Sequence, residues 1–209
     1  MSKGGNQRRW LQRQENDAYV KRAQAEGYRS RAIYKLMELN ERDRIHVQGK
    51  LVVDLGAAPG SWSQLAARWC QHKSEVIALD ILPMDSIADV QIIQGDFTDN
   101  AVFEQLLQVI NEREVGLVLS DMAPNISGVS SVDQPKSMYL AELALELARQ
   151  VLSKKGNFVT KLFQGEGFDD FVREARGSFT SLKVRKPKAS RPESREVYLV
   201  AKGYKGTTR

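Results

Sequence analysis

Hydrophobic and polar residues alternate in blocks along the chain, and the lengths of these blocks predict strands and helices in turn. Short apolar runs of seven to nine residues, several of them closed by glycine or aspartate, are typical of buried parallel strands. Longer segments with apolar residues at helical spacing separate them. The predicted strands span residues 50–56, 75–81, 90–97, 116–122, 156–163, 181–187 and 196–204. The predicted helices span residues 16–26, 32–42, 61–72, 100–112, 134–152 and 168–176, with Ser30 as a cap of the second.

This alternation predicts an open, mostly parallel sheet with helices on both faces. The last two strands are joined by only about ten residues, which is too short for a parallel crossover, so we expect them to pair antiparallel. The expected fold is therefore α/β and Rossmann-like, with seven mostly parallel strands and one reversed strand at the end of the sheet. Rossmann-like methyltransferases have this architecture. We expect residues 1–30 to form a basic arm and residues 31–209 a single domain.

Composition excludes several classes of protein. The one cysteine, Cys70, cannot form an internal disulfide and fits a reducing compartment. With only two histidines beside it, the usual zinc sites cannot be built, and we expect no metal. No apolar run approaches the roughly 20 residues of a membrane helix, and the N-terminus has no secretory signal. We therefore expect a cytoplasmic protein without a membrane partner. The absence of an exposed apolar stripe predicts a monomer.

Basic residues are concentrated near the two ends of the chain. The net charge is +5, but residues 1–35 alone carry +6 and residues 181–195 carry +5, so the remainder carries −6. Charge that serves only to solubilise a protein is not expected to separate in this way, although a solvated tail and loop remain an alternative. The separation favours a polyanionic partner such as nucleic acid.

A glycine-rich turn follows the first predicted strand in the segment VVDLGAAPGSW, residues 52–62. In open α/β folds, ligands bind at such turns, beside the carboxyl ends of the strands. Gly56 and Gly60 allow backbone conformations and a close ligand approach that a Cβ atom would prevent. The spacing matches neither the dinucleotide motif nor the phosphate-binding P-loop, so a nicotinamide-dependent oxidoreductase is disfavoured.

Four consecutive predicted strands each end near an aspartate. These residues are Asp54, Asp80, Asp96 and Asp121. An acid at the end of the second strand can accept hydrogen bonds from both hydroxyls of a ribose, and one at the end of the third can accept a bond from an adenine amine. Each aspartate alone is better explained as a cap or turn residue. Together with the glycine turn they favour a cationic cofactor over a pyrophosphate, and Trp62 is a candidate wall of its pocket.

Three further residues are candidates for chemistry. Lys161 lies within an otherwise apolar strand, where an ammonium is costly to bury unless it is paired. The alternative is an edge-strand lysine that extends to solvent. Lys35 lies in the helix before the first strand, and Glu196 opens the last strand. Residue patterns alone favour a solvated helix face or strand end for these two.

Several segments of the chain closely resemble the ribosomal RNA large-subunit methyltransferase E family, also called FtsJ. They are RSRAIYKL, DLGAAPGSW, LDILPMD, QGDF, SDMAPNISG, VTKLFQGEGFDD and SREVYLVA, and the resemblance runs from about Trp10 to Lys202. It implies S-adenosylmethionine-dependent methylation of the ribose 2′-hydroxyl of a uridine in 23S rRNA, within the large ribosomal subunit. It also implies site residues: Lys35, Asp121, Lys161 and Glu196 as the catalytic set, and Gly60, Trp62, Asp80, Asp96 and Asp121 as cofactor contacts.

The resemblance leaves the role of Lys161 open. As a neutral amine it would be a general base, which requires desolvation and the nearby charge of Lys35 to favour the neutral form. As an ammonium it would stabilise the developing alkoxide. RNA is expected to bind two groups of cations: Lys3, Arg8, Arg9 and Arg13 in the arm, and Lys183, Arg185, Lys186, Lys188, Arg191 and Arg195 in a loop.

Two rival functions remain. Base methylation at cytosine C5 needs a nucleophilic cysteine, and Cys70 lies in a predicted helix away from the strand ends. Exocyclic amine transfer typically uses an Asn/Asp-Pro-Pro-aromatic loop, whereas the sequence here is Asp-Met-Ala-Pro-Asn. A non-catalytic, RNA-binding ribosome assembly factor with a vestigial cofactor pocket would fit the charge pattern equally well, but it would not explain Lys161.

Overall fold

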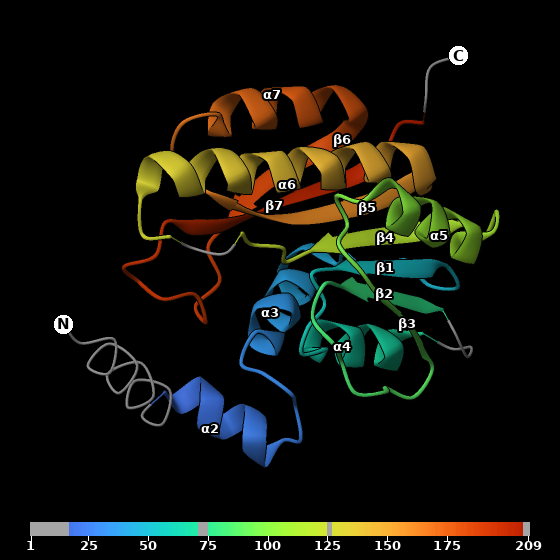
Figure 1. The fold of residues 1–209 in the computed structure, drawn as a ribbon, viewed down its shortest axis with the longest axis horizontal. Helices are drawn as coiled ribbons and strands as arrows, with labels where there is room; N and C mark the ends of the chain where they lie inside the picture. The colour runs from blue at the N-terminus through green and yellow to red at the C-terminus, as the bar shows by residue number, and fades with distance from the viewer. Residues whose placement is uncertain (1–16, 71–74, 125–126, 207–209) are drawn as a thin grey trace.

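A computed structural model of the chain describes residues 17–70, 75–124 and 127–206 (Figure 1). The strands in this part are β1 (Leu51–Leu55), β2 (Val76–Asp80), β3 (Val90–Gln94), β4 (Val115–Ser120), β5 (Leu152–Phe163), β6 (Phe179–Arg185) and β7 (Glu196–Tyr204). The helices are α2 (Ala18–Ala25), α3 (Ile33–Asp43), α4 (Ser61–Trp69), α5 (Asn100–Ile110), α6 (Ser130–Val151) and α7 (Phe168–Ser178). All seven predicted strands are confirmed.

The strands form one sheet in the order β3-β2-β1-β4-β5-β7-β6. β1 to β5 pair in parallel, and β7 is antiparallel to both of its neighbours, β5 and β6. The Rossmann-like α/β fold is therefore confirmed, but the reversed strand is not the outermost one. The chain crosses from β5 through α7 to β6, and β7 then returns into the space between them. This position gives β7 hydrogen-bonding partners along both edges.

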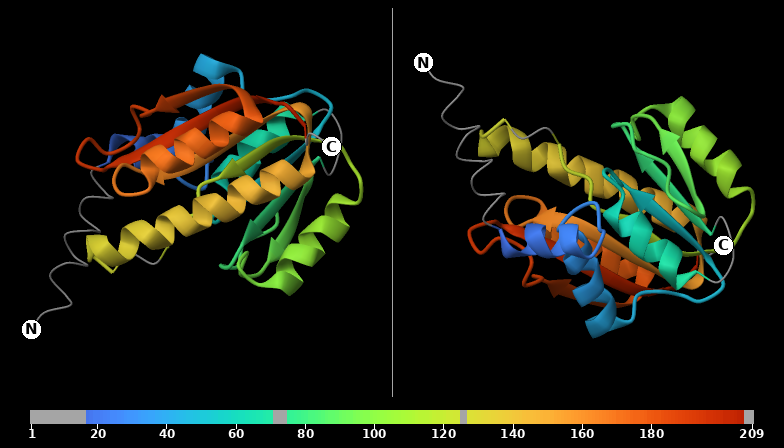
Figure 2. Two further views of the ribbon diagram at one scale, coloured as in Figure 1. Left: turned by 90° about the horizontal axis from the view of Figure 1, so that it is seen from above. Right: turned by 90° about the horizontal axis from the view of Figure 1, so that it is seen from below.

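Helices cover both faces of the sheet (Figures 1 and 2). On one face, α5, α6 and α7 pack over a core that includes Leu106, Leu145 and Phe171. On the other face, α3 and α4 pack over a second core that includes Leu36, Trp62 and Tyr198, and α2 reaches this core through the buried Ala23. Alternate residues of the central strands enter the two cores because side chains alternate across a sheet. α2 lies within the predicted basic arm, and the boundary at residue 30 remains a prediction.

The starts of two helices, α6 and α3, differ from the sequence-based prediction in an informative way. α6 begins at Ser130 instead of residue 134, because Asp133 in its first turn accepts hydrogen bonds from the backbone N–H groups of Ser127 (2.9 Å) and Gly128 (3.0 Å). Ser30 does not cap α3, whose N-cap is Ala32. The hydroxyl of Ser30 accepts a bond from the Ala32 N–H and lies 2.8 Å from the hydroxyl of Ser61 instead.

Candidate active site

The carboxyl ends of the central strands meet at one edge of the sheet and carry most of the predicted site residues. β1, β4 and β5 run in register there, with Leu55 opposite Ser120 and Ser120 opposite Thr160. Asp121 follows Ser120 directly, and Lys161 follows Thr160. The parallel pairing therefore places two residues from distant segments side by side.

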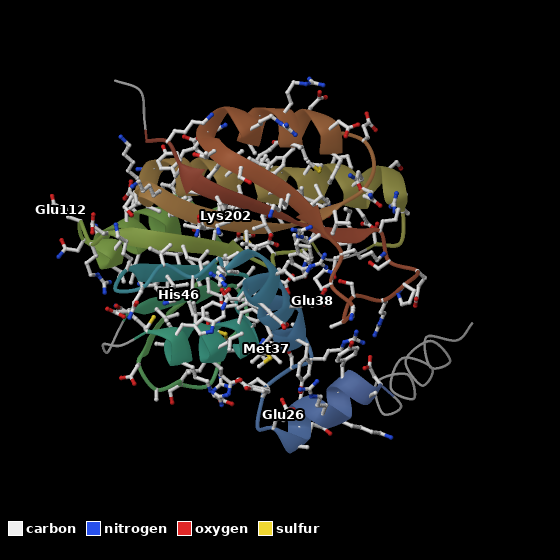
Figure 3. The ribbon with its side chains drawn as sticks, turned by 180° about the vertical axis from the view of Figure 1, so that it is seen from behind. Glu26, Met37, Glu38, His46, Glu112 and Lys202 are labelled. Carbon is white, nitrogen blue, oxygen red and sulfur yellow. The ribbon has the colours of Figure 1, made fainter. Side chains whose placement is uncertain are left out.

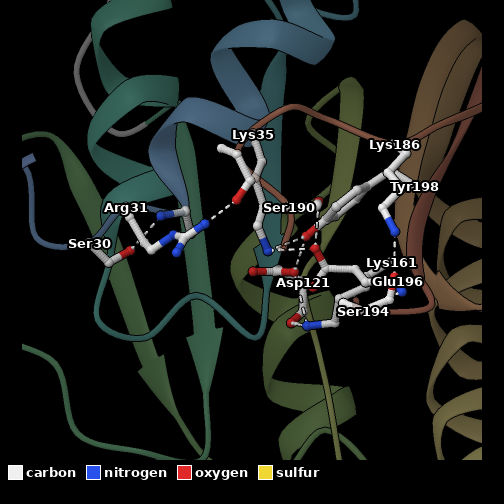
Figure 4. A network of polar contacts seen from close by, with 12 residues as sticks. Ser30, Arg31, Lys35, Asp121, Lys161, Lys186, Ser190, Ser194, Glu196 and Tyr198 are labelled. Carbon is white, nitrogen blue, oxygen red and sulfur yellow. Dashed lines mark hydrogen bonds and ion pairs between the residues drawn. The ribbon is translucent and has the colours of Figure 1, made fainter. Parts of the chain in front are cut away.

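All four predicted catalytic residues join one polar network with Tyr198 (Figure 4). Lys161 Nζ lies 3.0 Å from Asp121 Oδ1, and Lys35 Nζ lies 2.7 Å from Glu196 Oε1. The hydroxyl of Tyr198 connects the two ion pairs: it accepts from Lys35 Nζ at 3.2 Å and donates to Asp121 Oδ1 at 2.8 Å. The prediction that these four residues belong to one site is consistent with this arrangement, and their catalytic roles remain a prediction.

Lys161 is not an edge-strand lysine. β5 lies between β4 and β7, and only 8% of the Lys161 side chain is exposed. Its ammonium also donates to the backbone carbonyl of Asp121 at 2.5 Å. The buried charge is therefore satisfied by a carboxylate and a carbonyl from the same residue, as a buried ammonium requires.

The network sets the protonation of its acidic members. Burial by itself would raise the pKa of Asp121, but the charges of Lys161 and Lys35 and the hydrogen bonds from Lys161 and Tyr198 hold that pKa below its ordinary value. Burial, together with the nearby carboxylates Asp121 and Glu196, raises the pKa of Tyr198 well above its ordinary value. Tyr198 therefore stays protonated as a hydrogen-bond donor, and Asp121 stays ionised as the partner of Lys161.

Tyr198 and Ser190 are site residues that the sequence analysis missed. Tyr198 lies opposite Lys161 in the β5–β7 pairing. It also follows Glu196 by two residues, which places both on one face of the strand, and this spacing is a signal that could have revealed it. Ser190 Oγ donates to Glu196 Oε1 at 2.8 Å from the loop before β7. No sequence pattern marks Ser190, because the path of the loop brings it there.

The glycines of the turn after β1 are required by the protein's own backbone. Gly56 has φ +72°, and a Cβ atom there would lie 2.8 Å from backbone atoms of Met122. Gly60, the N-cap of α4, has φ +108°, and its Cβ atom would lie 2.6 Å from Ile87 Cδ1. Both values of φ favour glycine. Close packing among three loops at the strand ends therefore explains these glycines independently of any ligand.

Asp80 and Asp96 lie at the ends of adjacent strands but have different surroundings. Asp80 is nearly buried, and its two oxygens accept 2.8 Å bonds from the backbone N–H groups of Ala58 and Leu82. It thereby holds the glycine turn against the end of β2. Asp96 is exposed, and hydrogen bonds from the backbone and hydroxyl of Thr98 hold its pKa below the ordinary value.

Asp54 differs from the other three aspartates because it lies beneath the glycine turn, with no exposed surface. Its Oδ2 accepts a 2.6 Å bond from Ser63 Oγ in α4, and its Oδ1 has no hydrogen-bond partner. Burial raises the pKa of Asp54 to about 7, and the charges of Asp121 and Asp80 act in the same direction. The four aspartates therefore do not form an even acidic rim, because one of them is enclosed.

Apolar surface adjoins this acidic edge. Ile81 and Leu82, which follow Asp80, are each 61% exposed although both are large and hydrophobic. Neither residue was among the predicted site residues. Trp62, by contrast, is only 2% exposed, and its Nε1 donates to the Ala32 carbonyl at 2.8 Å. The indole therefore joins the glycine turn to the start of α3, and its contact with a cofactor remains a prediction.

The expected basic loop is only partly a loop. Lys183 and Arg185 lie in β6, and both form ion pairs with the buried carboxylate of Asp43. The prediction of a loop is therefore wrong for these two residues, and their contact with RNA stays a prediction. Four of the predicted cations are exposed in the segment between β6 and β7: Lys186, Lys188, Arg191 and Arg195. Lys3, Arg8, Arg9 and Arg13 lie outside the described residues.

Two negative observations apply to the described residues. Within residues 17–70, 75–124 and 127–206, no helix is long and apolar enough to cross a membrane. Over the same ranges, histidine, cysteine and acidic side chains form no group of three or more that could hold a metal ion.

Comparison with known proteins shows the family to which the chain is related. Residues 28–204 match the model of the FtsJ-like methyltransferase family. The chain is 55% identical to a "Ribosomal RNA large subunit methyltransferase E" of Stutzerimonas stutzeri, over 99% of this chain and 100% of the relative. A protein of the same name from Marinobacter nauticus is also 55% identical, over 98% and 99% of the two chains.

Solved structures share the fold. A crystal structure from Plasmodium falciparum, described as a ribosomal RNA methyltransferase, has a TM-score of 0.75 at 28% identity and covers 86% of this chain and 100% of its own. A Streptococcus mutans structure in complex with SAH has a TM-score of 0.52 at 11% identity, over 83% and 95% of the two chains, and supports the fold alone. With the family model matching most of its length, the chain belongs to the FtsJ-like methyltransferase family.

Proposed function

We propose that this methyltransferase uses S-adenosylmethionine to methylate the ribose 2′-hydroxyl of a uridine in 23S rRNA of the large ribosomal subunit. The observation that carries the proposal is the pairing of Lys161 with Asp121 beside the glycine turn. The names of the relatives support ribosomal RNA as the substrate. Such a substrate would place the protein in the cytoplasm, and we propose that it works as a monomer.

The residues around the glycine turn fit this cofactor. Its sulfonium and ammonium groups are positive, and carboxylates at the ends of β2, β3 and β4 would attract them. The exposed Ile81 and Leu82 offer an apolar surface to an adenine ring. We propose that Gly60, Trp62, Asp80, Asp96 and Asp121 hold the cofactor, which supplies an electrophilic methyl group when bound.

The chain's own residues would prepare the ribose oxygen for attack. A ribose hydroxyl is a very weak acid, so a base or a cation must assist it at neutral pH. Lys161 is held by Asp121 and would either accept the hydroxyl proton or stabilise the developing negative charge. Lys35 and Glu196, whose Nζ and Oε1 atoms lie 2.7 Å apart, would orient the ribose hydroxyl. Tyr198 remains protonated and keeps the two ion pairs aligned. Alignment of the reacting groups contributes several kcal/mol.

A methyl-transfer assay tests the proposed function. Purified protein is incubated with radiolabelled S-adenosylmethionine and either large ribosomal subunits or naked 23S rRNA from cells that lack the modification. We expect label in the rRNA, resistant to alkaline cleavage at one uridine because the 2′-oxygen is blocked. Label on a base would contradict the ribose assignment. The absence of label from both substrates would favour the assembly-factor alternative, which the intact Lys161–Asp121 pair otherwise disfavours.

Replacing Asp80 by alanine should mainly weaken cofactor binding. The substitution removes an acceptor for the ribose hydroxyls and releases the Ala58 N–H that holds the glycine turn. Losing hydrogen bonds to a charged group should raise the Kd for S-adenosylhomocysteine by about tenfold to a hundredfold in calorimetry. Asp85→Ala, an exposed aspartate in the loop that follows, is the matched control. An unchanged Kd in Asp80→Ala would remove Asp80 from the cofactor site.

RNA binding should weaken with salt, because lysine and arginine displace counterions from phosphates. If Lys188 and Arg191 each contact one phosphate of single-stranded RNA, the double alanine variant should reduce the slope of log K against log salt by about 1.4. The exposed residues Lys154 and Arg173 provide a control variant that leaves the slope unchanged. A salt-insensitive wild-type complex would refute the electrostatic interface.

A further inference from the structure

α3 is attached to β7 at both ends. Near its first turn, Lys35 contacts Glu196 and Tyr198 of β7. At its last residue, the backbone carbonyl of Asp43 accepts a 2.5 Å bond from Lys202 Nζ, also on β7. Lys202 is labelled in Figure 3, which views the molecule from behind. Lys35 and Asp43 therefore mark the two ends of the contact between α3 and β7.

The side chain of Asp43 forms the centre of a buried charge cluster. It has no exposed surface. Arg185 binds it through two bonds of 2.8 Å, from Nε to Oδ2 and from Nη2 to Oδ1, and Lys183 Nζ lies 3.2 Å from Oδ1. Hydrogen bonding from Arg185 is the main reason that the pKa of Asp43 is lower than usual, although burial opposes it and Lys183 assists. Asp43 therefore remains ionised, and its two-bond geometry with Arg185 is directional.

The spacing of these attachments matches along the helix and the strand. Lys35 and Asp43 are eight residues apart, which is about 12 Å along a helix. Tyr198 and Lys202 are four residues apart, which is about 13 Å along a strand. The two spacings are similar, so α3 can make both attachments to β7 at the same time.

The sheet places Arg185 next to the catalytic network. The β6–β7 pairing sets Arg185 opposite Tyr198, and the β5–β7 pairing sets Lys161 opposite Tyr198. Directly opposed residues project from the same face of a sheet. Arg185, Tyr198 and Lys161 thus form one row across three strands. The Asp43–Arg185 pair holds α3 at one end of this row, and the Lys161–Asp121 pair lies at the other.

We propose that Asp43, acting through Arg185, is a positioning residue. It fixes the position of the Lys35 side chain relative to Glu196 and Tyr198. The proposal rests on the proposed methyl transfer. Apolar packing of α3 through residues such as Leu36 and Leu39 is non-directional, so it resists separation of helix and sheet better than it resists sliding. The two-bond ion pair resists sliding. A misplacement of about 1 Å in a catalytic group can cost about a hundredfold in rate.

Steady-state kinetics of Asp43→Asn test this role. We expect kcat to fall about tenfold, while the KM for rRNA and the Kd for S-adenosylhomocysteine change less than about twofold. Asp170→Asn, which removes the carboxylate of an exposed pair with Arg173 in α7, is the matched control and should leave kcat unchanged. Asp43→Asn/Arg185→Gln removes both charges of the pair, so that no arginine is left buried without its partner, and should show the same loss if Asp43→Asn folds poorly. A kcat within about twofold of wild type in the folded variants overturns the proposal.

A second variant, Glu196→Gln, separates a positioning role of Asp43 from general destabilisation of the fold. In Glu196→Gln, where the ion pair of Lys35 is already lost, adding Asp43→Asn should lower kcat by less than about twofold, because the two changes act through one group. An undiminished tenfold loss overturns the proposal.

A readout without turnover keeps this test separate from the proposed function. With ¹³Cε-labelled lysines, the NMR signal of Lys35 should shift in Asp43→Asn but not in Asp170→Asn. An unmoved Lys35 signal overturns the positioning role. A wild-type protein that transfers no methyl group would instead overturn the proposed function. The NMR comparison would still test whether Asp43 positions Lys35.

Discussion

Replacing Lys161 by alanine is expected to lower kcat for methyl transfer by about 10²- to 10⁴-fold, the usual contribution of a positioned acid–base group. Its ammonium is almost fully buried and held 3.0 Å from Asp121, so solvent cannot readily take its place. Binding of the cofactor should be little affected, with a Kd for S-adenosylhomocysteine within about threefold of wild type. Single-turnover methyl transfer and calorimetry measure the two effects separately.

Lys154→Ala is the matched control for this prediction, because Lys154 lies on the same strand but is exposed. Near-normal methyl transfer by Lys161→Ala would contradict the assignment. Lys161→Arg then separates the two possible roles, because arginine stays charged and cannot act as a base. Substantial activity in Lys161→Arg would indicate electrostatic stabilisation, and activity as low as in Lys161→Ala would indicate general-base catalysis.

Replacing Asp54 by asparagine is expected to change how stability depends on pH. Burial raises the pKa of Asp54 to about 7, compared with 3.8 for an ordinary aspartate. The unfolded carboxyl therefore ionises first, and the free energy of unfolding falls as pH rises from about 4 to about 7. At 1.36 kcal/mol per pKa unit, this loss is about 4 kcal/mol. Asparagine has the shape of the protonated acid and does not ionise. The variant should therefore not lose this stability as the pH rises.

Urea unfolding at pH 5 and pH 8 measures this effect. Relative to wild type, Asp54→Asn should gain about 3 kcal/mol between the two pH values, because from pH 5 to about pH 7 the unfolded carboxyl is ionised while the folded one stays protonated. Asp89→Asn, at an exposed position, should show no such gain. A stability difference that stays constant between pH 5 and pH 8 would mean that Asp54 is not a buried titrating acid.

The alternation of apolar runs was sufficient to predict the fold class. The central strands of the sheet are apolar segments that a local pattern can reveal, and the connections between parallel strands follow general rules. The place of β7 could not be predicted in the same way. Two antiparallel strands joined by a short loop, such as β6 and β7, can add to a sheet with either strand outermost. Which strand is outermost depends on packing against α3 and α7, and no local pattern records that packing.

The sequence by itself determined which residues stand at the strand ends, because a run of apolar residues followed by glycine or aspartate marks where a buried strand stops. It therefore located Asp80, Asp96, Asp121 and Lys161 at one edge of the sheet. Only the tertiary structure decided which of these residues touch. The Lys35–Glu196 pair joins residues 161 positions apart. Such pairs depend on strand order, register and loop path, and these follow from the packing of the whole chain.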